Sequence, residues 1–322
     1  MKGEFEIIER IRQIMEEVAV PEKGSMGIGD DCAVIEAGGQ IIVSTDMLVE
    51  GSHFLFSDID PYDLGWKSAA VNISDIAAMG GAPVGTFLSL GLPKGLSDEW
   101  IDAFSRGYRD LSLRYGAKLL GGDTTSSPLG VVINVTVTGR IPEGSRLLKR
   151  SAAKPGDLIA VGGNLGDSGG GLKLILGSAE RGEDEQILIK RHYRPIPQIS
   201  LGQQLAANGK THAAMDISDG LAGDLMHILK ASGVDARVHL DKLPISDELR
   251  RCSLRYGWDS ALLAATAGED YVLLFTAAPD AELPEGCTVV GSILERQTEQ
   301  ANIQWMRNGN PLRESLSGFT HF

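Results

Sequence analysis

Cysteine is scarce in this sequence, and its few thiols lie far apart. Cys32, Cys252 and Cys287 form no Cys-x-x-Cys pair. An odd, scattered set argues against a disulfide framework, because such frameworks pair even numbers of cysteines, and it offers no thiolate cluster for zinc. We therefore expect the thiols to be reduced.

Long apolar runs and basic clusters are also missing. No apolar run reaches the roughly 18 residues of a transmembrane helix, and Met1–Glu6 lacks the apolar core of a signal peptide. The sequence has 30 basic and 43 acidic residues, which gives a net charge of −13. The basic residues form no continuous run that could bind the phosphate backbone of a nucleic acid. We expect a cytoplasmic protein with neither a membrane nor nucleic acid as its partner.

Length and composition are those of a two-domain globular protein. The 322 residues are 43% hydrophobic and 23% charged, which is enough for two cores. The polar, basic stretch 140–154 leads into the turn Lys154–Asp157, so we place the boundary there and expect domains 1–145 and 146–322.

Apolar periodicity predicts alternating helices and strands, an α/β or α+β fold. The expected helices cover residues 6–18, 61–79, 97–115, 198–208, a segment from about 168, and one that follows 219 and ends at 232. The expected strands cover 40–45, 86–92, 117–120, 131–139, 158–161, 236–240, 271–276 and 288–294.

Short acidic motifs recur where apolar runs meet glycine or a helix start. They are Gly29–Asp31, Ser44–Asp46, Gly121–Asp123 and Asp216–Gly220, with Asp75 inside an alanine-rich stretch. We expect these carboxylates at the ends of strands, where ligands bind. Clustered carboxylates repel one another and are costly to desolvate unless cations neutralise them, so Mg²⁺ bound together with substrate phosphates is the simplest explanation. Ordinary helix caps and turns are the alternative, and Asp98 is expected to be such a cap.

The glycine-rich segment Gly162–Gly171 follows a predicted strand and resembles several known motifs. It lacks the Lys-Ser/Thr pair of a P-loop and does not match Gly-x-Gly-x-x-Gly. It does contain Gly-x-Ser-x-Gly around Ser168, the pattern of a hydrolase elbow. Six residues separate Val161 from Ser168, too many for that sharp turn, and a serine hydrolase stays open as a distant alternative.

Two further segments carry polar residues suited to a substrate. His53 follows Asp46 on a loop, where it can donate to a phosphate or stack on a ring, although a lone histidine is more often structural. Glu269 and Asp270 open a predicted strand, most simply as a turn, and their charge also suits a cationic substrate.

Six segments, in this order, resemble the thiamine-monophosphate kinase family. They are Gly27–Ala33, Ser44–Asp46 with Glu50–Phe54, Gly65–Asp75, Gly121–Thr124, Met215–Leu221 and Gly268–Tyr271, and a closing Gly318–Phe322 is similar to that family's aromatic tail. The resemblance spans nearly the whole chain. It extends to a wider group of ATP-using proteins that includes aminoimidazole-ribonucleotide synthetase, selenophosphate synthetase and a hydrogenase maturation protein.

The resemblance implies two α/β domains with the aminoimidazole-ribonucleotide-synthetase-like fold. It also implies a homodimer whose N-terminal domains close a β-barrel, with ATP between the domains. The implied reaction transfers the γ-phosphoryl group of ATP to the phosphate of thiamine monophosphate, with several Mg²⁺ ions per site. Because that acceptor phosphate is already ionised at neutral pH, no general base is expected.

The resemblance further assigns roles to single residues. The implied magnesium ligands are Asp30, Ser44, Thr45, Asp46, Asp75, Asp123, Asp216 and Asp219; the implied ATP contacts are Gly122, Asp123, Arg150 and Ser218; the implied substrate contacts are His53, Glu269 and Phe319. Phe319 stands where Tyr or Trp is expected, which keeps an aromatic face but removes a hydroxyl or indole donor.

Other functions remain as alternatives. Another ATP-using relative of the cyclo-ligase type stays open. A selenophosphate synthetase would be expected to carry a reactive Cys near a glycine-rich start, whereas Cys32 lies inside the aspartate motif. A hydrogenase maturation protein would be expected to end in Cys, and this sequence ends in His321–Phe322. A non-catalytic nucleotide sensor would be expected to have lost some of the acidic positions.

Overall fold

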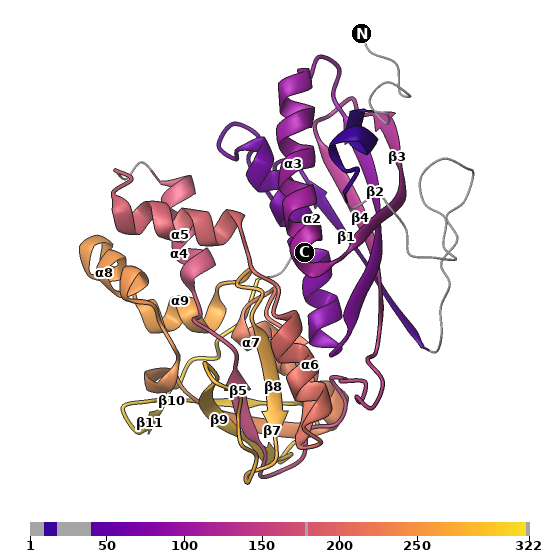
Figure 1. The fold of residues 1–322 in the computed structure, drawn as a ribbon. Coiled ribbons are helices and arrows are strands. Elements are labelled where there is room, and N and C mark those ends of the chain that lie inside the picture. Colours follow the sequence, from indigo (N-terminus) through magenta and orange to yellow (C-terminus); the bar gives the residue numbers. More distant parts are fainter. Residues whose placement is uncertain (1–9, 18–39, 178–179, 320–322) are drawn as a thin grey trace. The chain divides into compact units, whose positions relative to one another are not determined.

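The computed structural model describes residues 10–17, 40–177 and 180–319. The chain separates into two compact units. Unit 1 comprises Met1–Ile76 and Gly81–Pro142, and unit 2 comprises Ala77–Gly80 and Glu143–Phe322. Figure 1 labels the elements of each. In the described part of the chain, no helix combines the length and the apolar character needed to cross a membrane.

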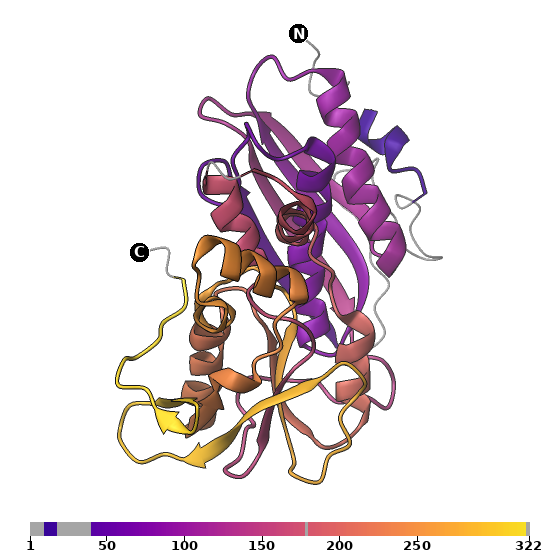
Figure 2. The ribbon, with the colours of Figure 1, turned by 90° about the vertical axis from the view of Figure 1, so that its left-hand side faces the viewer.

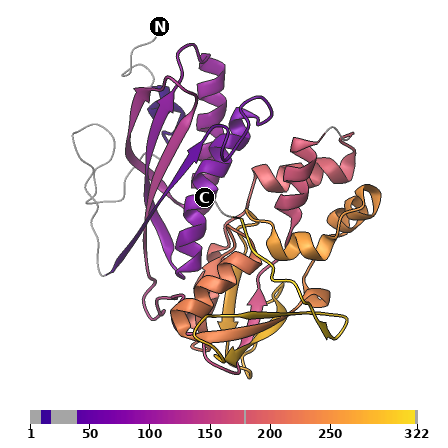
Figure 3. The same ribbon diagram turned by 180° about the vertical axis from the view of Figure 1, so that it is seen from behind.

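Unit 1 is built on a four-stranded sheet. Its elements are β1 (Ile41–Val49), α2 (Pro61–Ala78, whose last two residues belong to unit 2), β2 (Ala82–Leu92), α3 (Asp98–Tyr115), β3 (Lys118–Ser126) and β4 (Val132–Arg140). The strand order is β1-β4-β2-β3; β4 pairs antiparallel with both neighbours, and β2 pairs parallel with β3. Among the described residues, α2 and α3 lie on one face of this sheet (Figures 1 and 3).

Helices α2 and α3 pack closely because each carries a glycine at their contact. A Cβ added to Gly65 would lie 1.9 Å from the carbonyl oxygen of Phe104, and one added to Gly107 would lie 1.8 Å from that of Tyr62. Any side chain at either position would push the helices apart. The tight pair keeps the sheet-facing side of α2 in a defined place.

The N-terminus of α3 corrects one expectation from the sequence. Ser97, not Asp98, is the cap: its hydroxyl accepts a hydrogen bond from the amide of Trp100 (3.2 Å). Asp98 lies in the first turn and pairs with Arg10 (3.3 Å), at the start of a helical segment over residues 10–14. Acids favour a helix N-terminus, so Asp98 still has a structural explanation.

Unit 2 is built on a seven-stranded sheet. Its elements are β5 (Leu158–Val161), α4 (Asp167–Leu176), α5 (Glu183–Tyr193), α6 (Ile199–Ala207), β6 (Thr211–Asp216), α7 (Leu221–Ser232), β7 (Val234–His239), the 3-10 turn η1 (Leu240–Lys242), α8 (Asp247–Tyr256), α9 (Ser260–Thr266), β8 (Leu273–Ala277), β9 (Thr288–Glu295), β10 (Ile303–Arg307) and β11 (Asn310–Pro311). The strand order is β11-β10-β7-β9-β5-β8-β6. Figure 2 shows the chain after β11 running from that edge of the sheet toward the helices of unit 2.

Apolar side chains of this sheet fill two cores, one on each face. Along β5, Ile159 and Val161 belong to the cluster that contains α7 and α9, whereas Ala160 belongs to the cluster that contains α6. Successive strand residues point to opposite faces, so α7 and α9 cover one face and α6 the other. A strand buried on both faces is a continuous apolar run, which is why β5 was recognisable in the sequence.

The sequence predicted the strand positions better than their lengths. We expected the motifs Ser44–Asp46 and Gly121–Asp123 at the ends of strands. Strand β1 instead continues to Val49 and β3 to Ser126, so both motifs lie inside strands. The sequence also gave no expectation for α5, α8 and α9. Helix α8 is strongly polar, with Leu249, Cys252 and Ser253 as its buried residues.

Candidate active site

In unit 1, the alternation of β1 separates the three residues of its acidic motif. Ser44 and Asp46 lie on the face toward α2: the Ser44 hydroxyl bonds to the Asp75 carboxylate, and the Asp46 amide donates to Asn72 Oδ1 (3.1 Å). Thr45 lies on the opposite face, where its hydroxyl donates to the carbonyl of Val135 (3.1 Å). The side chain of Thr45 therefore does not join the group formed by Ser44, Asp46 and Asp75.

The carboxylates of Asp46 on β1 and Asp75 on α2 lie close enough for their charges to interact. Burial and, second, the negative charge of Asp75 raise the pKa of Asp46 to about 6. Like charges held close together without a cation disfavour ionisation. With the Ser44 hydroxyl, the pair offers only oxygen atoms, the donors that Mg²⁺ prefers, so this group fits a hard cation.

Asp123 and Gly122 lie on β3, two strands beyond β4. The sheet register aligns Asp46 with Gly122, and it aligns Asp123 with Ser89 and Asn134, on the face that carries Thr45. Three strand spacings of about 4.8 Å separate Asp46 from β3 by about 14 Å. Because two ligands of one Mg²⁺ lie at most about 4.2 Å apart, Asp46 and Asp123 do not share an ion in this sheet.

Gly122 has a packing reason to be glycine. A Cβ there would lie 1.8 Å from the carbonyl oxygen of Leu88 in β2. The Asp123 side chain beside it is exposed, and Oδ1 accepts from the amide of Thr124 (2.9 Å). The glycine thus permits the close β2–β3 approach that presents Asp123 to solvent.

His53 is held against the end of β1. Its Nδ1 accepts from the amide of Val49 (3.0 Å), and its own amide donates to the Val49 carbonyl (2.9 Å). Accepting at Nδ1 places the proton of the neutral ring on Nε2, which makes that nitrogen a donor. Asp30, the remaining implied ligand of unit 1, lies outside the described residues.

In unit 2, three segments far apart in sequence meet through main-chain hydrogen bonds. The amide of Glu269 donates to the carbonyl of Ser218 (2.8 Å), and the amide of Phe319 donates to the carbonyl of Asp219 (2.8 Å). The loop after β6, the loop before β8 and the C-terminal segment therefore form one cluster. It gathers the implied ATP contact Ser218, the implied metal ligand Asp219 and the implied substrate contacts Glu269 and Phe319.

Glycines make this meeting possible. A Cβ on Gly268 would lie 2.3 Å from the Ser218 carbonyl oxygen, and one on Gly318 would lie 2.4 Å from that of Asp219. The neighbouring backbone is also unusual, since Glu269 and Tyr271 have φ values of 65° and 51°. Non-glycine residues with such positive φ values are strained by about 1–3 kcal/mol each and are concentrated at functional sites.

Asp224 organises the loop after β6 and was missed in the sequence. It is buried in the first turn of α7, and its Oδ2 accepts from the amides of Ser218 and Asp219 (3.0 Å each). Burial, and then the charges of Asp216 and Asp219, raise the pKa of Asp224 to about 7, against the lowering effect of those amides. The sequence could have indicated this role, because Asp224 follows Asp219 by five residues. An acid in the first turn of a helix is common, however, and it did not distinguish Asp224 from an ordinary one.

Asp270 has a structural role that differs from the one expected. Its two carboxylate oxygens accept from the amides of Gly166 (2.6 Å) and Ser168 (3.0 Å), so it ties the glycine-rich loop before α4 to the Glu269 segment. Burial raises the pKa of Asp270 to about 7, although both amides oppose that shift. A carboxylate used in this way holds the backbone and is not directed at a cationic substrate.

The surroundings of Ser168 do not form a hydrolase triad. Ser168 Oγ lies 2.9 Å from His192 Nδ1, and Glu269 Oε2 lies 3.6 Å from the same Nδ1. A triad needs the serine and the acid on different ring nitrogens, so that one proton can be relayed. Ser168 is also 2% exposed, which leaves a substrate no access to its hydroxyl.

Arg150 lies on the surface of unit 2 near α7. Burial, and then the charges of Arg150 and Lys230, lower the pKa of His227, while Asp219 raises it. The guanidinium of Arg150 is therefore within electrostatic range of the His227 side chain, which Asp219 also influences.

Within residues 10–17, 40–177 and 180–319, no three His, Cys, Asp or Glu side chains form a ready-made metal site.

Comparisons with known proteins cover nearly the whole chain. Residues 29–141 match the family described as AIR synthase related protein, N-terminal domain, and residues 154–302 match its C-terminal domain. The chain is 41% identical to a thiamine-monophosphate kinase of Salmonella typhimurium over 99% of this chain and 98% of the relative.

Solved structures agree with that similarity. A thiamine-monophosphate kinase from Stenotrophomonas maltophilia superposes with a TM-score of 0.80 at 38% identity, covering 94% of this chain and 96% of that chain. The structure described as AaThiL complexed with AMPPCP and TMP superposes with a TM-score of 0.79 at 33% identity, covering 99% and 97%.

Proposed function

The chain belongs to the thiamine-monophosphate kinases within the AIR synthase related proteins, and from this premise we propose how it works. The γ-phosphoryl group of ATP passes directly, in line, to the phosphate of thiamine monophosphate with the help of several magnesium ions. The ATP analogue and TMP named for the AaThiL relative support ATP and thiamine monophosphate as the substrates here.

One observation carries the proposal: the meeting of Ser218, Asp219, Glu269 and Phe319 in unit 2. A carboxylate offsets the thiazolium cation of thiamine, and an aromatic ring stacks on its flat rings. Anionic side chains with oxygen donors in the adjoining loop suit metal-bound phosphates. The same cluster therefore combines recognition of the acceptor with a place for the charge that the reaction must neutralise.

Asp46 and Asp75 in unit 1, with Asp216 and Asp219 in unit 2, would hold magnesium. Bound magnesium would screen the repulsion between donor and acceptor phosphates and stabilise charge on the transferring oxygens. Asp123 and Thr45 would serve further cations, because their side chains lie on the face of the sheet opposite that of Asp46.

The protein itself contributes position. Asp224 holds the Ser218–Asp219 amides, His53 presents a donor at Nε2 for a phosphate, and Gly122 and Arg150 contact ATP. No side chain has to remove a proton, since the acceptor oxygen is already ionised at neutral pH. Phosphoryl transfer of this kind depends mainly on alignment and electrostatic stabilisation.

Direct assays test this function. Purified protein, ATP, magnesium and thiamine monophosphate should yield thiamine diphosphate, whereas free thiamine or aminoimidazole precursors should not replace the acceptor. EDTA should abolish turnover. A rate that saturates once magnesium equals ATP, with no further dependence, would contradict more than one ion per site. ATP made chiral at its γ-phosphorus should give inverted product; retention would indicate a phosphorylated enzyme intermediate instead.

We further propose that two chains pair through β1 and together close a β-barrel. Among the described strands, β1 is an edge of its sheet, and it exposes Val43 and Met47 by 63% and 53%. Exposed apolar edge strands invite pairing. In light scattering, Val43→Lys should yield monomers, while Leu129→Lys, at a 94% exposed loop position, should leave the dimer intact. A monomeric parent protein would rule this pairing out.

A further inference from the structure

A buried serine and histidine lie directly behind Glu269. Ser168 and His192 are each 2% exposed, and their Oγ and Nδ1 atoms are 2.9 Å apart. Glu269 Oε2 is 3.6 Å from the same Nδ1, and its side chain is 26% exposed. The histidine thus connects a fully enclosed hydroxyl with a carboxylate that reaches solvent.

The position of this pair is set by two consecutive contacts between α5 and the start of α4. Arg191 Nη1 donates to Asp167 Oδ2 (2.8 Å), and the next residue, His192, meets the next residue, Ser168. Gly171 lets the helix backbones approach, since a Cβ there would lie 2.4 Å from the carbonyl oxygen of Leu188. The histidine ring has little freedom to move.

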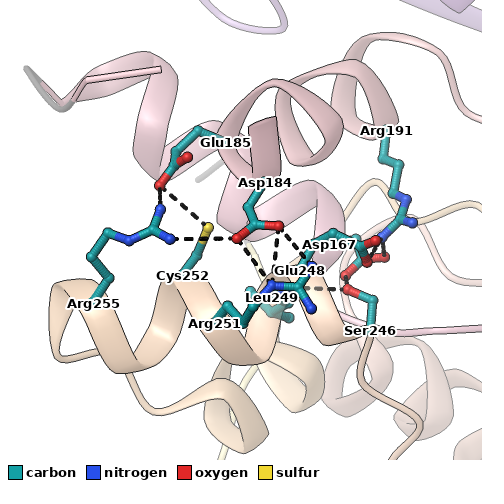
Figure 4. Close-up of polar contacts among 10 residues, drawn as sticks. All are labelled: Asp167, Asp184, Glu185, Arg191, Ser246, Glu248, Leu249, Arg251, Cys252 and Arg255. Atoms are coloured by element: carbon teal, nitrogen blue, oxygen red, sulfur yellow. Dashed lines mark hydrogen bonds and ion pairs between the residues drawn. The ribbon is translucent and has the colours of Figure 1, made fainter. Parts of the chain in front are cut away.

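Helix α5 is also held at its N-terminal end. Asp184 accepts from Arg251 (2.7 Å), and the buried Glu185 pairs with Arg255 (Figure 4). Glu185 also accepts from the Tyr256 hydroxyl (2.9 Å), and these three partners all lie on α8. Figure 4 also shows Asp167 between Arg191 and Ser246. The segment carrying His192 therefore belongs to a rigid group of helices.

The two neighbours of Nδ1 favour a proton on that nitrogen. A carboxylate only accepts, so a bare Nδ1 would direct its lone pair at Glu269. An Nδ1–H group instead donates to the Ser168 hydroxyl and directs positive charge toward Glu269. At 3.6 Å this second contact is longer than a hydrogen bond, and it acts as an electrostatic attraction that orients the carboxylate.

From this geometry we propose that the buried Ser168–His192 pair positions the Glu269 carboxylate for the cationic ring of the acceptor, and thereby sets acceptor affinity. The inference rests on the proposed role of Glu269 in binding thiamine monophosphate. The backbone of Glu269 is already fixed by its bond to Ser218 and its φ of 65°. What remains to be set is the direction of its side chain, and His192 faces that side chain from within unit 2.

Removing the His192 ring should weaken binding of thiamine monophosphate and leave binding of ATP unchanged. We expect His192→Leu to raise KM for thiamine monophosphate about fivefold, a coupling typical of residues in contact, with KM for ATP and kcat within about twofold. His192→Asn, whose amide N–H can replace Nδ1–H, should recover most of the affinity. A matched control is His212→Leu, because His212 also contacts a carboxylate in unit 2, that of Asp157 (2.9 Å); its KM values should be unchanged.

A double-mutant cycle decides whether His192 acts through Glu269. Glu269→Gln alone should raise KM for the acceptor, and adding His192→Leu should then change nothing further. Additive effects, or an equal loss for ATP and acceptor, would overturn the positioning role. If His192→Leu does not fold, the cycle of Ser168→Ala with Glu269→Gln gives the same decision. Parent protein that makes no thiamine diphosphate would instead overturn the proposed function, so the two failures are distinct.

Discussion

The acidic residues of the two units are held in different ways. In unit 1 they lie on regular elements, with Asp46 on β1, Asp75 on α2 and Asp123 on β3, and strand alternation and register decide where each one points. In unit 2, Asp216 ends β6, whereas Asp219 and Glu269 lie on loops that main-chain hydrogen bonds join beside glycines. Substitution of a carboxylate should therefore change chemistry alone in unit 1, whereas a single methyl group in unit 2 should change the shape of the site.

The largest effect is expected in unit 1. Asp46→Asn should slow transfer about 100-fold or more, about 3 kcal/mol of transition-state stabilisation. Its free energy of unfolding without magnesium should not fall, because burial and Asp75 already disfavour the ionised form and raise the pKa of Asp46 to about 6. Steady-state rates and urea denaturation test this. Asp98→Asn, at another acid of unit 1, is the control and should keep its rate; near-normal turnover of Asp46→Asn would make Asp46 a structural residue.

A methyl group on Gly268 should be the next most harmful change. Gly268→Ala brings a Cβ to 2.3 Å from the Ser218 carbonyl oxygen, and relieving that clash should cost about 1–3 kcal/mol of stability and lower the rate with both substrates. Gly91→Ala in β2, where the Cβ would meet Val132 at an ordinary 3.4 Å, should be tolerated. Equal tolerance of both changes would show that the site does not depend on the close approach of Gly268 to the Ser218 carbonyl.

A smaller effect on one substrate is expected at the end of the described chain. Phe319 is anchored by its amide, and its side chain is 56% exposed, so Phe319→Ala should leave folding intact. Loss of stacking on the thiamine rings should raise KM for thiamine monophosphate about tenfold, or about 1.4 kcal/mol, with KM for ATP nearly unchanged. Kinetics with each substrate varied in turn measure this. An equal change for both substrates, or none for the acceptor, would remove Phe319 from the site.

The smallest effect concerns pH. Because the folded protein raises the pKa of Asp270 to about 7, it retains a proton there that the unfolded chain releases near pH 4, and stability falls as pH rises between these values. The contribution is about 1 kcal/mol between pH 5 and 6. Urea denaturation without magnesium should show a shallower fall for Asp270→Asn than for the parent. An identical pH dependence would show that Asp270 is ionised throughout that range.

The sequence predicted some elements well because they depend on local patterns. The β-branched run from residue 41, the alanine-rich α2 and the apolar β5 matched their expected positions. Helices α5, α8 and α9 were not anticipated. The buried face of α8 consists of only three residues, and its ion pairs with α5 join residues about 70 positions apart (Figure 4).

The order of the acidic motifs along the chain was enough to point to the family and to an ATP-dependent reaction. The sequence by itself determined which carboxylates, glycines and aromatic residues are available, because residue types and spacings are written in it. Only the tertiary structure decided that Thr45 turns away from Asp46, that Asp224 and Asp270 hold loops, and that His192 stands behind Glu269. Such contacts depend on strand register and on close backbone approach between distant segments, and no local pattern encodes either.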